Sequence, residues 1–463
     1  MEKNLGSAAL LAGTAIIFTA ATPSIGQDLF SGGGLSLEVN STLRVNDNLG
    51  LDDPSPGIST LWDNRFTLGF VSETPVSEFT FDIGGTVRGA ALPGLPLGAT
   101  FDDPFAVLGY RFEGANSRFE ADASYRKIDL SSINPLSLIE DDELGETDLI
   151  VDDGSRATTA AWVLFESGLN DPFGFGVEVE HKGVQYSGTA DPGLFDSRTN
   201  SASVFTRYRF SSVAEGRLTA SWEKYDADDV TLTSRETFDL TAGLVYEFDP
   251  ITTLEASLGY AYITETTNLP STAVQRGLSG SVELTRAMPN GSAGLVFESD
   301  LTANGRRSEL TASRALELPT GALEASLGVS LGPSGTFIPI GSLDYVYELP
   351  RGEITASLNR RAATNTAGND VVTMGASFGY STDINRLSSL SFDADFASVA
   401  DFGFAPVDRT TLTSLRVTYS YELAPDWDLS AGYEHRIRTE TGVTRRASNE
   451  VYLMLDYKFD ARP

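Results

Sequence analysis

The chain has 463 residues, a formal net charge of -31, no cysteine and two histidines. This excess of acid excludes a nucleic-acid-binding protein, because phosphate contacts need clustered Lys and Arg. The absence of cysteine excludes disulfides and thiolate metal sites. Hydrophobic residues make up 41%, and Tyr (16) and Phe (26) far outnumber Met (4), a balance that suits strands and interfacial aromatic rings. The length fits several soluble domains or one large closed barrel.

The N-terminal segment has the composition of an export signal. Lys3 supplies positive charge, an apolar run follows over residues 5–21, and Ser24 and Gly26 are small residues placed for cleavage before Gln27. A membrane anchor is the alternative, but about 17 apolar or small residues make a short helical span. We therefore predict a signal peptide at residues 1–26 and a single β-domain over residues 27–463.

Alternation with a period of two begins soon after this segment and continues to the end. The first predicted strand puts Leu35, Leu37 and Val39 on one face, and residues 451–459 do the same in the last. Two strands follow the first, and the rest begin near residues 105, 118, 157, 173, 199, 217, 236, 253, 276, 292, 306, 322, 337, 353, 370, 386, 409, 428 and 447. The total is about 22, within a range of roughly 18 to 24. An even number predicts that the last strand pairs with the first.

The predicted turns alternate in length along the chain. Short turns such as 116–117, 249–250, 289–291, 319–321, 350–352 and 424–426 alternate with longer polar segments such as 88–104, 131–156, 186–198, 264–275, 361–369 and 438–446. A membrane barrel shows this pattern, with short periplasmic turns and long outer loops. The sequence thus predicts an all-β fold, a transmembrane antiparallel up-and-down β-barrel. A soluble β-sandwich or propeller is the alternative, but neither predicts alternating turn lengths.

The strands start too early to leave room for an N-terminal plug domain. Large energy-coupled outer-membrane transporters carry such a plug before their barrel, so the sequence is expected to depart from that family.

A few charged residues fall on the apolar phase. His181 and His435 lie near predicted strand ends, where a polar side chain reaches headgroups or water, and they are interpreted as interfacial rather than catalytic. Arg314 interrupts an apolar run, and a midplane Arg would cost roughly 2 to 4 kcal/mol. We expect either a bulge there or a strand that faces something other than lipid. No catalytic, cofactor-binding or metal-ligating residue is predicted.

The opposite, polar phase carries both signs of charge among many Ser, Thr and Gly residues. Such a wall suits water and polar solutes, and a wide barrel encloses an aqueous lumen. The predicted pore-lining residues are Arg44, Arg65, Asp82, Arg88, Arg111, Glu120, Asp122, Arg126, Arg207, Arg209, Asp239, Glu283, Asp300, Glu324, Asp393, Asp395 and Arg416.

One long loop is densely acidic. Its carboxylates are Glu140, Asp141, Asp142, Glu143, Glu146, Asp148, Asp152 and Asp153. Their spacing does not match the Ca²⁺ loop template, so a solvated surface is the simpler interpretation, with divalent cation binding as the alternative. The loop over residues 131–156 is also long enough to fold into the mouth and narrow it.

The sequence Arg44-Val45-Asn46-Asp47-Asn48-Leu49 after the first strand resembles a turn of the poorly characterised β-barrel porin family of Gram-negative outer membranes. The resemblance supports the fold more than the function. Together with the polar, charged lumen, it leads us to expect a porin-like passive channel for small hydrophilic solutes in the cell outer membrane, reached through the periplasm. A non-channel barrel for exopolysaccharide export, adhesion or envelope structure is the alternative.

The C-terminal strand carries a further prediction. An amphipathic strand that ends on aromatic residues resembles the assembly signal of outer-membrane barrels, which makes Tyr457 and Phe459 the signal residues. The expected partners are outer-membrane lipid and lipopolysaccharide, the barrel assembly machinery and small polar solutes. Nucleic acid is not expected, no cofactor is expected, and a homo-oligomer is left open.

Overall fold

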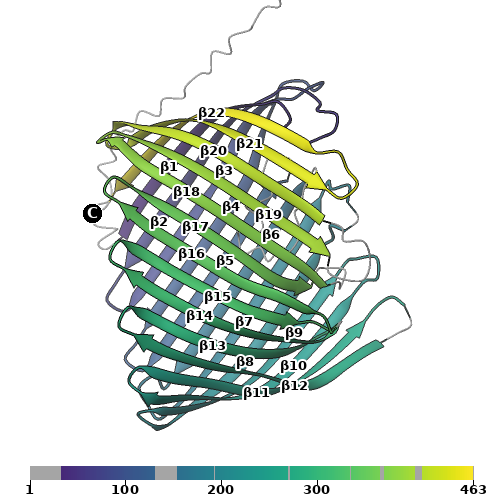
Figure 1. Cartoon of the computed structure of the whole chain (residues 1–463), viewed down its shortest axis with the longest axis vertical. Helices are drawn as coiled ribbons and strands as arrows, with labels where there is room; N and C mark the ends of the chain where they lie inside the picture. The colour runs from purple at the N-terminus through teal and green to yellow at the C-terminus, as the bar shows by residue number, and fades with distance from the viewer. Residues whose placement is uncertain are drawn as a thin grey trace, which may run out of the picture.

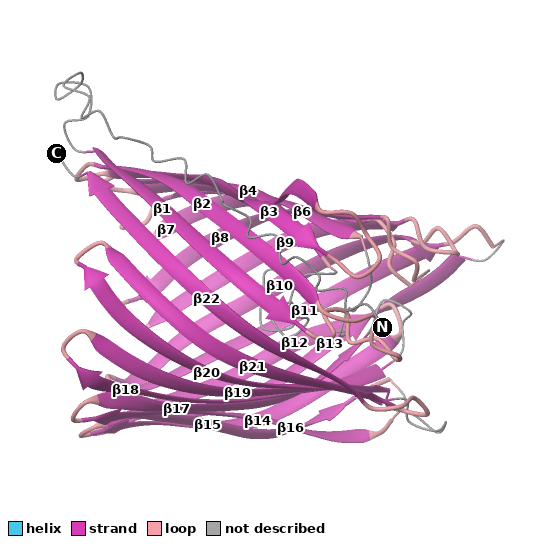
Figure 2. Ribbon diagram, turned by 90° about the horizontal axis from the view of Figure 1, so that it is seen from above, coloured by secondary structure: helices cyan, strands magenta, loops and turns pink. Residues whose placement is uncertain are grey.

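A computed structural model describes residues 33–130, 154–191, 193–269, 272–333, 335–364, 370–401 and 409–461. They form one sheet of 22 antiparallel strands, in which each strand pairs with its neighbours in sequence and β1 pairs with β22. The sheet therefore closes into a barrel of strongly tilted strands, seen from two directions in Figure 1 and Figure 2. No helix among the described residues is long and apolar enough to cross a membrane.

The strands are β1 (Gly33–Asn46), β2 (Ser59–Glu73), β3 (Ser77–Ala91), β4 (Gly98–Glu113), β5 (Ser117–Asp129), β6 (Ser155–Ser167), β7 (Phe173–Ser187), β8 (Ser197–Ser211), β9 (Ala214–Ala227), β10 (Ser234–Asp249), β11 (Thr252–Thr266), β12 (Thr272–Met288), β13 (Gly291–Thr302), β14 (Gly305–Leu318), β15 (Gly321–Leu331), β16 (Phe337–Leu349), β17 (Gly352–Thr364), β18 (Asp370–Asn385), β19 (Ser388–Asp401), β20 (Arg409–Ala424), β21 (Trp427–Glu440) and β22 (Arg446–Ala461). The prediction of an all-β barrel of about 22 strands closed by its terminal strands is confirmed. The predicted signal peptide and the acidic residues 140–153 lie outside the described residues.

The two ends of the barrel differ in their connections. At one end, the short-turn end, the gaps between strands are two to five residues, as between β10 and β11 or β20 and β21. At the other, the long-loop end, most connections are longer, and the one between β1 and β2 spans residues 47–58. The two-residue connection between β13 and β14 is an exception at this end. By the rule for membrane barrels, the long-loop end faces outward from the cell.

Two glycines show why the short turns need this residue. Gly291 and Gly321 each follow a two-residue turn with φ of 124° and 151°. A Cβ there would lie 2.2 Å from the Ala315 carbonyl oxygen and 2.0 Å from that of Val346. A side chain would therefore clash with the backbone of the adjacent strand, β14 at Gly291 and β16 at Gly321.

The register assigns one face of every strand to the lumen. Apolar side chains such as Leu258 and Leu327, 63% and 74% exposed, alternate with polar ones along the same strands. On the polar face, side chains meet across an intervening strand: Ser279 Oγ on β12 donates to Asp239 Oδ2 on β10 at 3.3 Å. Gly259 of β11 lies between them. Contacts that skip a strand are expected on a concave surface, so the polar face is the inner wall and the apolar face is the outer one.

Arg314 lies on the outer face without a bulge. The pairing of β14 with β13 and with β15 runs without a register shift. Its guanidinium reaches back to the short turn, where it donates to the Ser292 and Ala315 carbonyl oxygens at 2.6 and 2.9 Å and to Asn290 Oδ1 at 2.9 Å. The expectation of a bulge was wrong, because the residue lies near the short-turn end, where a long cationic side chain reaches past the hydrocarbon.

Candidate functional site on the inner wall

The inner wall is strongly acidic over nine consecutive strands, β11 to β19. The register places the following carboxylates on the lumen face: Glu255, Glu265, Glu283, Glu298, Asp300, Glu309, Glu317, Glu324, Asp344, Glu348, Glu353, Asp383, Asp393 and Asp395. Within the described parts of these strands, Arg307 and Arg361 are the cations on this face. We call this surface the acidic wall. It concentrates negative potential on one side of the lumen.

Small hydroxyl side chains line the acidic wall at mid-height. Facing serines on neighbouring strands bond to each other at 2.7 Å in the pairs Ser257–Ser281, Ser326–Ser342 and Ser357–Ser377. Because these hydroxyl side chains are short, they leave the lumen wide and polar at this level.

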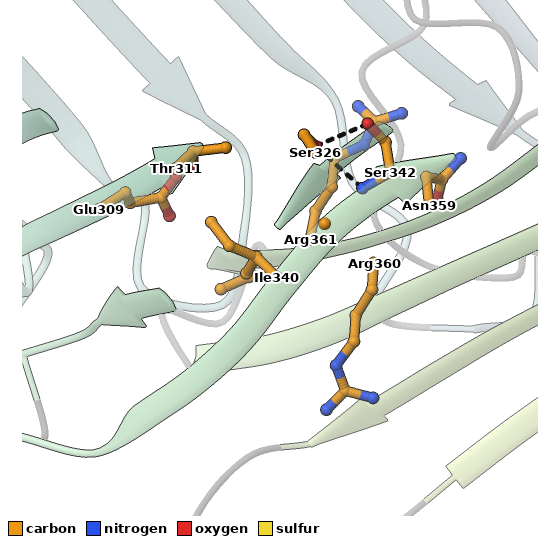
Figure 3. Close-up of a pocket in the computed structure, with 10 residues that line it drawn as sticks. Glu309, Thr311, Ser326, Ile340, Ser342, Asn359, Arg360 and Arg361 are labelled. Carbon is orange, nitrogen blue, oxygen red and sulfur yellow. Dashed lines mark hydrogen bonds between the residues drawn. The ribbon is translucent and has the colours of Figure 1, made fainter. Parts of the chain in front are cut away.

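A hollow of about 330 Å³ opens in the acidic wall between β14 and β17. Glu309 and Thr311 lie on one side of it, the Ser326–Ser342 pair on its floor, and Asn359 and Arg361 on the other side (Figure 3). Arg360, the next residue, points the other way, and its Nε donates to the Pro339 carbonyl oxygen at 2.9 Å. The hollow thus offers an anion, a cation and several neutral hydrogen-bonding groups to a ligand in the lumen.

The facing part of the wall, on β1 to β5, is filled by an ion-pair cluster. Arg88 of β3 contacts Asp63 at 2.7 Å, Asp102 at 3.4 Å, Asp103 at 3.1 Å and Asp129 at 3.0 Å, and its side chain is only 7% exposed. Arg44 of β1 also pairs with Asp63. These ion pairs, with Arg88 buried among its partners, connect the five strands on the lumen face.

A backbone irregularity builds this cluster. The β3–β4 register shifts between Gly84 and Thr86, and Asp103 adopts a φ of 50°, rare for a residue with a side chain. The shift lets Asp102 and Asp103 both reach Arg88. Bulges re-aim side chains in this way.

The register places every predicted pore-lining residue on the inner wall, but in different environments. Arg88 is buried and Arg44 is partly buried in the ion-pair cluster, whereas Arg111 is 62% exposed and pairs with Glu120 at 3.2 Å. A channel-lining role for the set remains a prediction.

Glu309, Asn359 and Arg361 of the hollow were missed, although they lie on the polar phase of their strands. Their place among the polar, inward-facing positions of these strands could have identified them from the sequence.

Both histidines lie on the outer face of the barrel. Each bonds to an asparagine on the adjacent strand of the outer face: His181 Nδ1 to Asn200 Oδ1 at 2.8 Å, and His435 Nδ1 to Asn449 Oδ1 at 2.9 Å. Across the described part of the chain, no three His, Asp or Glu side chains come together as a metal site would require. The carboxylates of the acidic wall therefore act through a shared electrostatic potential and do not form a site that coordinates a single ion.

Comparisons with known proteins identify the type of barrel. No protein-family model and no curated protein matches the sequence. Among solved structures, the chain is similar to the FrpB iron transporter from Neisseria meningitidis (TM-score 0.56, 9% identity) and the ferric-catecholate import receptor Fiu from E. coli (0.56, 9%). It is also similar to the copper transporter OprC (0.53, 13%). The match covers 92%, 91% and 92% of this chain and 81%, 81% and 80% of theirs.

The chain has the fold of these 22-stranded β-barrels. At these identities the similarity shows the fold, and it does not show a porin family. The prediction of a passive porin channel is overturned, because the solved barrels that this chain resembles are named as transporters and receptors. The alternative of export, adhesion or envelope structure gains no support from them either. These neighbours are not enzymes, in agreement with the prediction of a non-enzyme.

Proposed function

We propose that the protein is a ligand-recognising importer of the Gram-negative outer membrane, and that its ligand is a small cation or a positively charged metal complex. The acidic wall carries this proposal. Some barrels of this architecture take up iron, ferric catecholates or copper, according to their names. The negative charge of this lumen favours positively charged ligands, such as metal cations, over anionic ones such as ferric catecholates.

Electrostatics explains the expected selectivity. The lumen encloses the acidic wall between low-dielectric barrel walls, which focus its field and raise the local concentration of cations. Ferric catecholates are anionic and would meet repulsion along nine consecutive strands. Because ions screen charges over about 8 to 10 Å at physiological salt, cation binding should weaken as salt is raised.

The hollow between β14 and β17 gives the ligand a defined first contact. Glu309 offers charge, while Asn359 and the serine pair offer hydrogen bonds that orient a ligand. Glu298 faces Glu309 directly across the β13–β14 ladder, and Asp300 lies on the same face two residues on. These three carboxylates lie together on the acidic wall beside the hollow.

Equilibrium binding to two metal complexes of opposite charge tests the proposal. The purified barrel in detergent is titrated with hexaamminecobalt(III), a trivalent cation, and with ferric tricatecholate, a trivalent anion. We expect the cation to bind at least about tenfold more tightly at low salt, with an affinity that falls as salt rises. Equal affinity for the two complexes, or a preference for the anion, would refute the proposal.

Charge-neutral variants locate the binding surface. The triple variant Glu298→Gln, Asp300→Asn and Glu309→Gln should weaken cation binding about tenfold or more, because three carboxylates near the hollow lose their charge.

The matched control removes three carboxylates from the inner face of β2, β3 and β4, as Glu73→Gln, Glu78→Gln and Glu113→Gln. It loses the same net charge and should change the affinity by no more than about twofold. An equal effect of both triples would show that net charge, and not the acidic wall, governs binding.

A further inference from the structure

We propose that Asn46, Asp47 and Asn48 form a latch that holds the closing seam of the barrel at its long-loop end. The same latch folds the loop of residues 47–58 into the lumen as a wedge. The inference is independent of the ligand, because it rests on contacts of the seam itself.

The seam between β1 and β22 differs from every hairpin of the barrel. Its strands stand at opposite ends of the sequence, so no turn joins them, and their pairing from Leu35 with Ala461 to Asn46 with Glu450 closes the sheet. Closing a ring without a local turn costs more chain entropy than closing a hairpin. An opened seam would also expose two unpaired strand edges.

On the outer face, Asp47 continues the seam beyond the last strand pair. Its carboxylate accepts hydrogen bonds from the backbone N–H and the side-chain amide of Asn449, both at 2.7 Å. Its own N–H donates to the Asn449 carbonyl oxygen at 3.1 Å. Tyr433 of β21 donates to Asn449 Oδ1 at 2.7 Å, and His435 contacts the same oxygen. One aspartate is thereby tied to two strands on the other side of the seam.

On the inner face, two asparagines make the matching contacts. Asn46 donates to Glu450 Oε2 at 3.0 Å and accepts from Ser448 Oγ at 2.9 Å. The Asn48 side-chain amide donates to the Ala447 carbonyl oxygen at 3.0 Å. Asn46 and Asn48 are only 1% and 4% exposed. Buried polar groups with satisfied bonds are costly to expose one at a time, which gives the latch its strength.

Asn48 also sets the course of the loop. Its side chain bonds to both the carbonyl oxygen and the N–H of Asp52, each at 3.0 Å, which turns the chain inward. Leu51, between them, has a φ of 53°. A leucine holds this left-handed conformation only where its surroundings determine it.

The wedge docks on strands far from its own. Leu51 is 2% exposed and packs with Ala397 and Val399 of β19 and Leu412 of β20. On the way, the Leu49 carbonyl oxygen accepts a bond from Arg436 of β21 at 3.4 Å. The loop therefore crosses the inner face of β22 and β21 and fastens the seam to the two strands beyond them.

Cysteine chemistry tests the latch, because the chain has no cysteine of its own. The thermal midpoint of unfolding is followed by the heat-dependent gel mobility of the barrel. We expect Asn48→Ala to lower the midpoint by several degrees. A disulfide across the seam, at the facing pair Val45→Cys and Val451→Cys, should restore it. If Asn48→Ala alone does not fold, then folding of the same variant with the seam disulfide under oxidising conditions supports the latch in the same way.

Two controls separate the seam from general stability. Asn268→Ala removes an asparagine bond of 3.1 Å to the Val230 carbonyl oxygen between two other loops of the rim and should lower the midpoint by less. A disulfide within the β10–β11 hairpin, at Leu240→Cys and Tyr260→Cys, should not rescue Asn48→Ala. The latch is refuted if Asn48→Ala matches Asn268→Ala, or if the hairpin disulfide rescues as well as the seam disulfide.

The wedge is tested in the otherwise intact protein. Leu51→Cys should react with a bulky maleimide at least about tenfold more slowly than Val230→Cys, a loop position that is 83% exposed. Adding Asn48→Ala should remove most of this difference. Equal labelling of the two cysteines would show that the loop does not dock in the lumen.

Discussion

Replacing Arg88 by methionine probes the ion-pair cluster on β1 to β5. Arg88 is 7% exposed and contacts four aspartates, so the variant leaves four partly buried carboxylates without this arginine. Breaking a buried pair by removing one partner costs about 3 to 5 kcal/mol. We expect a loss of that size in the free energy of unfolding, measured by urea titration of the barrel in lipid vesicles at pH 7.5.

The loss should depend on pH in a defined direction. In the wild type, Arg88 stabilises only while its partners are ionised, and in the variant the carboxylates repel one another only while ionised. Both effects fade as pH falls toward about 4, where aspartates begin to take up protons. The difference between variant and wild type should therefore shrink on acidification.

An exposed ion pair provides the control for Arg88. Arg111→Met removes one of the two arginine partners of Glu120, and because the Arg111 side chain is 62% exposed, the loss should stay below about 1 kcal/mol. A loss below about 1 kcal/mol for Arg88→Met, or one that does not change with pH, would contradict a stabilising role for the buried ion-pair cluster.

Two further predictions concern single side chains. Partial burial raises the pKa of Asp229 in the β9–β10 loop, but hydrogen bonds from Thr233 and Thr231 outweigh it and hold that pKa below its usual range. Its contribution to loop stability is present above the unfolded pKa of 3.8 and is lost as pH falls through the lower folded value. Asp229→Asn should reduce the hydrogen-exchange protection of the Thr233 amide at pH 7, and unchanged protection would contradict this. Arg314→Leu should change the unfolding free energy by less than about 1 kcal/mol, whereas a gain of about 2 to 4 kcal/mol would place the arginine at the bilayer midplane.

Alternation was sufficient to predict the barrel because each strand carries the same constraint. A strand with one face on lipid and one on water must place apolar residues at every second position, and a slip of one residue reverses the faces. The phase of Leu35 to Val45 and that of Val451 to Phe459 therefore agree, as the pairing of the two strands requires. The strand count followed from repeating this test along the chain.

The features of the site escaped this test because they depend on departures from alternation or on distant contacts. Asp102 and Asp103 meet Arg88 through a register shift, which no pattern of period two contains. Leu51 looked like a loop residue, yet it packs on strands more than three hundred residues away in the chain. The turn at Asn46 was noticed as a resemblance, but its bonds to both faces of β22 needed the closed barrel.

Strand number explains why the fold was predictable while the porin interpretation was wrong. The diameter of a barrel grows with its number of strands, so 22 strands enclose a wide lumen whatever passes through it. Width alone suggested a channel. Barrels of the same architecture that share about a tenth of the residues of this chain are instead named as transporters and receptors of metal ligands. The fold requires only apolar residues at the outward positions of each strand, so the same barrel can form at such low identity. The charge of the inward positions can then differ from one barrel to another. Specificity must therefore be read from the inner wall, and here that wall is acidic along nine strands and wedged at its mouth by the loop that also closes the seam.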